Sequence, residues 1–244
     1  MSALGHFLEE EGIATVAIAL IRKQAENTRP PRALWVPFEL GRPIGPPSDV
    51  AFQKQVILAA LSLLDARPQA SLIVDFPDDD PRETSDPSWR PPVSPHPDPP
   101  PLAGEGAALA AAMEAELRAL APAYAASCTA RERSTVGLSG LAPAACGEYV
   151  AAWLRGERPA SPVADMSPAL ALRFAIDDLK AFALEAAIAR GAPSSTQLGD
   201  WLWNDTALGA GLQALRRDCL AGDDERLKAV AAFFVPALRV PPGG

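Results

Sequence analysis

A short loop between a predicted strand and a predicted helix carries the side chains best suited to binding a small charged molecule. It runs from Glu39 to Gly45 and reads Glu-Leu-Gly-Arg-Pro-Ile-Gly. Arg42 can pair with a carboxylate through two parallel hydrogen bonds, and Glu39 can orient an amine. Gly41 and Gly45 have no side chain, so backbone amides there can approach a ligand closely. The same residues also suit a rigid turn in which Arg42 and Glu39 pair with each other or with helix ends, and both interpretations stay open.

Three further basic side chains are weaker candidates. Arg32, which follows Pro31, either adds a second positive charge beside the loop or flanks a strand in solvent. His6 lies on the first predicted helix, where it serves in acid–base chemistry or is partly exposed and idle. We expect His96, inside a proline-rich stretch, to be solvated.

The C-terminal half offers an acidic pair, Asp177-Asp178, and a cluster of Trp201, Trp203 and Asp205. Adjacent carboxylates bind a metal only where other ligands converge, and no second acidic pair at helical spacing accompanies them. The sequence therefore predicts no metal site. We expect the two tryptophans to be core anchors or an interface patch.

The three cysteines, Cys128, Cys146 and Cys219, are odd in number and widely spaced, with no Cys-x-x-Cys pair. This pattern indicates reduced, partly buried thiols rather than a disulfide framework or a zinc site. The sequence also lacks a P-loop, a Gly-x-Gly-x-x-Gly after a strand and a Gly-x-Ser-x-Gly. It predicts no cofactor.

Composition excludes several classes of protein. The 244 residues carry 22 Lys and Arg against 30 Asp and Glu, a formal charge of −8, and 48 % are apolar. The acid excess argues against a nucleic-acid binder, and the apolar content against a fully disordered chain. Glutamates 9–11 precede the apolar stretch 12–21, which is too short to span a membrane and lacks the basic start of a secretory signal. We expect a soluble cytoplasmic protein.

Residues 1–77 alternate between helical and strand patterns. Apolar, β-branched runs predict strands over 15–20, 33–36 and 72–74, and apolar spacing predicts a helix over 49–64 that Ser48 or Asp49 caps. Buried strands alternating with helices are typical of a small parallel sheet with flanking helices. We expect this segment to be α/β.

Residues 78–106 are rich in proline, which excludes a helix or a central strand there. The sequence predicts an extended linker or a strap across the surface; recognition by a proline-binding module is the alternative.

Residues 107–244 show only helical patterns, so the protein is expected to be helix-dominated overall, ending in an all-α bundle. Helix starts are predicted at Pro143, at Ser167-Pro168, after Ser195 or Thr196, and after Asp223 or Asp224.

Four short motifs occur in order between Leu4 and Leu64. They are Phe7-Leu8-Glu9 followed by Gly12-Ile13-Ala14-Thr15-Val16, Pro31-Arg32-Ala33-Leu34, Phe38-Glu39-Leu40-Gly41-Arg42-Pro43-Ile44-Gly45, and the helix with Phe52-Gln53 and residues 56–61. In order and spacing this quarter of the chain resembles the selenoprotein B family of glycine, sarcosine, betaine and D-proline reductases, with Ala14 in place of a family proline.

The resemblance implies reductive cleavage of an amino-acid-derived substrate by a selenocysteine or cysteine nucleophile just before the first helix. Here only Met1, Ser2 and Ala3 precede Leu4, and no cysteine occurs before Cys128. The chain is then a non-catalytic relative, or a separate chain supplies the nucleophile, or Cys128 or Cys146 has taken over.

Two functional hypotheses follow. In the first, the chain is reductase-like and binds a small amino-acid-like carboxylate through Glu39, Gly41, Arg42, Gly45 and Arg32, or serves as a reductase subunit. In the second, it is a non-catalytic accessory or assembly protein whose helical half is a docking surface for a protein partner, with Trp201 and Trp203 in the contact. Neither hypothesis assigns a catalytic residue.

Overall fold

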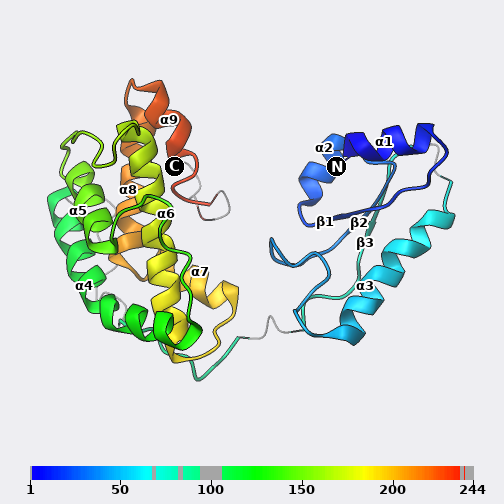
Figure 1. The fold of residues 1–244 in the computed structure, drawn as a ribbon, viewed down its shortest axis with the longest axis horizontal. Helices are drawn as coiled ribbons and strands as arrows, with labels where there is room; N and C mark the ends of the chain where they lie inside the picture. Colours follow the sequence, from blue (N-terminus) through cyan, green and yellow to red (C-terminus); the bar gives the residue numbers. More distant parts are fainter. Residues whose placement is uncertain (1, 68–69, 82–84, 94–105, 237–238, 240–244) are drawn as a thin grey trace. The chain divides into compact units, whose positions relative to one another are not determined.

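The computed structural model describes residues 2–67, 70–81, 85–93, 106–236 and 239. The chain divides into two compact units, Met1–Thr84 and Ser85–Gly244. The first is α/β and the second is helical in its described residues, which confirms the expected fold class (Figure 1).

The first unit is built on a three-stranded parallel sheet. Its strands are β1 (Ala17–Ala19), β2 (Arg32–Trp35) and β3 (Leu72–Asp75), in the order β1-β2-β3. Central β2 is the most buried of them, with Ala33 and Leu34 almost completely shielded from solvent. This explains why its sequence is a nearly continuous apolar run.

Three helices surround this sheet. Helices α1 (Ser2–Glu10) and α2 (Arg22–Thr28) lie beside each other and away from α3 (Val50–Ser62), which continues into a 3₁₀ turn, η1 (Leu63–Asp65) (Figure 1). Asp49 caps α3 by accepting a hydrogen bond from the Phe52 N–H, as one of the two predicted caps. The buried face of α3 joins the sheet in one core, where the rings of Phe38, Phe52 and Phe76 contact one another.

The second unit is a helical bundle around one apolar core. Its helices are α4 (Gly106–Arg131), α5 (Pro143–Leu154), α6 (Pro168–Ala187) with the 3₁₀ turn η2 (Ile188–Arg190), α7 (Ser195–Asn204), α8 (Ala207–Ala221) and α9 (Glu225–Ala231) (Figure 1). Among the described residues, no helix of either unit is both long and apolar enough to cross a membrane.

Local signals set the starts of most of these helices. Ser167 caps α6 and is followed by Pro168 at the first helical position, and Asp224 caps α9, both as predicted. The predicted cap of α7 is wrong by one or two residues, because Ser194 rather than Ser195 or Thr196 takes the role. The reason is Gln197, whose side chain accepts from the Ser194 N–H while Ser194 accepts from the Gln197 N–H, a capping box.

Part of the proline-rich stretch packs against the bundle. In the Ser85–Val93 segment, Trp89 is only 8 % exposed, donates to the Ala187 carbonyl at 3.1 Å and meets the Trp201 ring edge-on. Asp86 exchanges two hydrogen bonds with the Gln197 side chain. These described residues therefore belong to the helical unit, whereas the prolines between 94 and 105, and His96 with them, lie outside the described residues.

Candidate functional site

The predicted ligand loop follows the carboxyl end of β2 and consists of two successive turns. The Arg42 N–H donates to the Glu39 carbonyl, and the Gly45 N–H donates to the Arg42 carbonyl, each at 3.0 Å. Gly41 and Gly45 both adopt positive φ, 92° and 86°. At Gly45 a Cβ would lie only 2.5 Å from the Phe52 ring, so glycine is required for both backbone and packing reasons.

The charged side chains of this loop lie near each other and remain accessible. Arg42 Nη1 is 3.8 Å from Asp80 Oδ2 and 4.0 Å from Glu39 Oε2, and the Arg42 and Glu39 side chains are 46 % and 36 % exposed. Both separations exceed hydrogen-bond length. Among the described residues the Arg42 side chain has these two ion pairs and no hydrogen bond, so its N–H donors are available. Sequence reasoning missed the part played by Asp80, which is buried and comes from the segment after β3.

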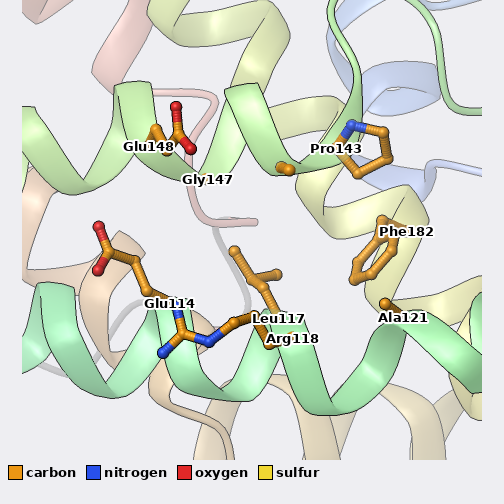
Figure 2. A pocket seen from close by; sticks show the side chains of 9 residues that line it. Glu114, Leu117, Arg118, Ala121, Pro143, Gly147, Glu148 and Phe182 are labelled. Atoms are coloured by element: carbon orange, nitrogen blue, oxygen red, sulfur yellow. The ribbon is translucent and has the colours of Figure 1, made fainter.

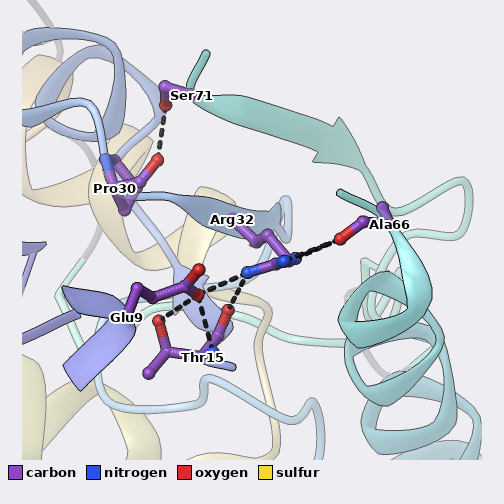
Figure 3. Close-up of polar contacts among 6 residues, drawn as sticks. All are labelled: Glu9, Thr15, Pro30, Arg32, Ala66 and Ser71. Carbon is purple, nitrogen blue, oxygen red and sulfur yellow. Dashed lines mark hydrogen bonds and ion pairs between the residues drawn. The ribbon is translucent and has the colours of Figure 1, made fainter. Parts of the chain in front are cut away.

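Arg32 is placed differently from both expectations. It is the first residue of β2, whereas the loop follows the last, so Arg32 adds no charge beside Arg42. It is also not solvated, being 5 % exposed. Its guanidinium donates twice to the Ala66 carbonyl, at 2.9 and 2.6 Å, and pairs with Glu9 (Figure 3). Arg32 in β2 therefore connects Glu9 of α1 with Ala66, the residue that follows η1.

Glu9 completes this partly buried network of hydrogen bonds. It accepts hydrogen bonds from the Thr15 N–H at 2.7 Å and the Thr15 hydroxyl at 2.9 Å (Figure 3). Burial by itself would raise the pKa of Glu9, but the hydrogen bonds from Thr15 and the positive charge of Arg32 outweigh it and lower the pKa. The carboxylate is therefore charged and fully engaged in folding contacts.

Replacing Arg32 with methionine is expected to destabilise the α/β unit by about 2 kcal/mol, because the Ala66 carbonyl loses its donor and the Glu9 carboxylate loses its cationic partner. Hydrogen exchange of residues 1–81 measures the loss. Arg67→Met, an exposed arginine in the same unit, is the control and should leave exchange unchanged. Equal protection in both variants would contradict the structural role of Arg32.

His6 and the cysteines offer no obvious nucleophile or general base. His6 is exposed, and its Nε2 lies 2.8 Å from the Arg29 carbonyl. Cys146 and Cys219 are buried, and burial raises the pKa of both thiols, that of Cys219 to about 11. Cys128 lies near the carboxyl end of α4 with its Sγ 4.0 Å from Glu185, whereas reactive cysteines lie beside cations or helix N-termini.

The acidic pair on α6 divides into two unrelated side chains. Asp177 is partly exposed and pairs with Arg173 and Lys180. Asp178 is 1 % exposed and accepts hydrogen bonds from the N–H groups of residues 137, 138 and 139 and from the Ser139 hydroxyl. No group of three potential metal ligands occurs among the described residues.

The structure decides between the two interpretations of Trp201 and Trp203. They are 2 % and 7 % exposed and belong to the core of the bundle. They are core anchors, as one interpretation had it. The expectation that they take part in a docking contact is wrong, because side chains buried to this degree cannot touch a partner.

Each unit contains a cavity lined by described residues. One, of about 720 Å³, runs along β1 between α1 and α2, and the ligand loop reaches it only through Leu40. The other, of about 390 Å³, lies between α4 and α5 (Figure 2). Its charged end carries Glu114, Arg118 and Glu148, and its apolar end is closed by Phe182. Sequence reasoning missed both because each is lined by segments that only the fold brings together.

Comparisons with known proteins add no family. No protein-family model matches the chain. No curated protein and no solved structure matches it either.

Proposed function

We propose that the α/β unit binds a small amino-acid-like zwitterion at the Glu39–Gly45 loop, and that the chain's own cysteines perform no reductive chemistry on it. One observation carries the proposal. A half-exposed guanidinium and a carboxylate of opposite charge lie 4.0 Å apart just after the central strand of a parallel sheet. Ligands of open α/β sheets bind at this edge.

The surrounding charges favour a zwitterion over a plain carboxylate. Asp80 holds Arg42 from one side, and Asp78 and Asp79 precede it in the chain. A ligand carrying only negative charge would meet repulsion from these carboxylates. An amino acid avoids this repulsion, because its carboxylate binds Arg42 while its ammonium group faces Glu39.

The surroundings of the three cysteines support a binding role in which no thiolate of this chain attacks the ligand. Cys146 and Cys219 are held protonated by burial, and Cys128 has a carboxylate as its neighbour. In this proposal the chain is either a relative of the reductase family that only binds substrate, or a reductase subunit whose nucleophile another chain supplies.

Arg42→Gln is expected to weaken binding of the zwitterion about tenfold to a hundredfold, because the variant loses a charge-assisted hydrogen-bonded pair. Calorimetric titration of the full chain with glycine, sarcosine, betaine and D-proline measures this effect. Arg67→Gln removes an exposed arginine that follows η1 and should bind like the wild type. Wild-type protein that binds none of the four, or an Arg42→Gln variant that binds equally well, would refute the proposal.

A further inference from the structure

Helix α3 has two apolar faces, and the sheet covers only one of them. Phe52, Val56 and Ala60 pack in the α/β core. On the opposite side Ile57, Leu58 and Leu61 are 41 %, 54 % and 50 % exposed. Their spacing in the sequence places them on one stripe of the helix. Three large apolar side chains side by side on a single helix form a contiguous patch rather than scattered exposure.

Charges of opposite sign stand at the two ends of this stripe. Lys54 lies before it and Asp65, in η1, lies after it. Eleven positions separate the two residues, which is about three helical turns, so both fall on the face of the apolar stripe. Both side chains are exposed, and within the described residues neither has an ion pair or hydrogen bond.

The resulting face runs from Lys54 through Leu61 to Asp65. Two copies of this face are complementary in charge when their helices run antiparallel. When a second α3 lies against it head to tail, Lys54 of each copy meets Asp65 of the other. Between these ends, Ile57 and Leu58 of one copy pack on Leu61 of the other. A parallel pairing would instead place like charges together.

We propose that α3 forms an isologous interface between two copies of this chain, with paired α3 helices antiparallel across a twofold axis. Such an interface brings the same patch of both subunits together, as closed dimers require. One helix pair buries less surface than the roughly 1,600 Å² of a standard interface, so the dimer is weak and depends on protein concentration.

Charge reversal tests the proposal on the full-length protein by sedimentation over a concentration series that reaches the high micromolar range. Lys54→Glu and Asp65→Lys each place like charges opposite each other, so each variant alone should weaken dimerisation at least about tenfold. An equimolar mixture of the two variants restores both attractive pairs and should form a heterodimer. The double variant should again form a homodimer.

The apolar part of the interface has a matched control. Leu61→Ser should weaken the dimer, whereas Leu138→Ser, at a leucine of similar exposure in the helical unit, should not. A wild-type chain that stays monomeric at every concentration overturns the proposal. A dimer whose stability is unchanged by both charge reversals also overturns it, and so does a mixture of the two variants that does not associate. These results are expected if another segment of the chain covers α3.

Discussion

Asp178→Ala is expected to cost the helical unit about 3–5 kcal/mol of unfolding free energy, because three backbone N–H groups and one hydroxyl lose the buried carboxylate that accepts their hydrogen bonds. The carboxylate accepts from the N–H groups of residues 137, 138 and 139 at 2.8, 2.9 and 2.9 Å. It also accepts from the Ser139 hydroxyl at 2.6 Å. These bonds hold the connection between α4 and α5 against α6. Urea unfolding followed by circular dichroism measures the loss.

The neighbouring residue provides the control. Asp177 is only 22 % exposed but pairs with Arg173 and Lys180 rather than with backbone groups. Asp177→Ala should therefore change stability by about 1 kcal/mol or less. Similar losses for the two variants would show that Asp178 does not have the role described.

The same contacts fix the sign of a pH effect. Burial alone would raise the pKa of Asp178, but the hydrogen bonds from Ser139, Gly137 and Leu138 outweigh it and lower the pKa. The unfolded chain therefore binds this proton more readily than the folded one. The contribution is present above the unfolded pKa, about 4, and is lost as the pH falls through the lower folded value. The stability difference between wild type and Asp178→Ala should shrink over that range.

Trp89→Ala is expected to destabilise the helical unit by about 3–5 kcal/mol, since it removes a large buried ring and leaves a cavity. The ring packs against Trp201 with centroids 6.4 Å apart and donates to Ala187. Unfolding of the full chain in urea, followed by far-ultraviolet circular dichroism, measures the effect.

Two milder variants separate the contributions at this position. Trp89→Phe keeps an aromatic ring but leaves the Ala187 carbonyl without its donor, so we expect a loss of about 1–2 kcal/mol. Ser88→Ala, at the exposed neighbour, should be close to neutral. If Trp89→Ala were also nearly neutral, the Ser85–Val93 segment would not be part of the folded unit.

Much of the fold could be predicted because its signals are local. Helix starts at Pro143, Ser167-Pro168 and Asp224 depend on side chains and backbone groups within one turn. The three strands were recognisable from short apolar runs. The loop after β2 was placed correctly for the same reason, since Gly41 and Gly45 mark its turns in the sequence.

The roles of individual polar and apolar side chains required the tertiary structure. Arg32 and Asp178 look like surface charges in the sequence, and their partners lie 17 or more positions away. Trp89 stands among prolines, yet it is buried against a helix about 100 residues further on. Periodicity also could not show which apolar face of α3 meets the sheet, because both faces repeat with the helical period.

The sequence alone thus determined the order and kind of elements, the acidic character of the chain and the position of a charged loop at a strand end. Only the tertiary structure decided that Arg42 stays accessible while Arg32 is buried and hydrogen-bonded. It also decided that one apolar face of α3 is exposed to solvent. The physical reason is range: caps, turns and periodicity act over a few residues, whereas burial and ion pairing depend on which distant segments the fold brings into contact.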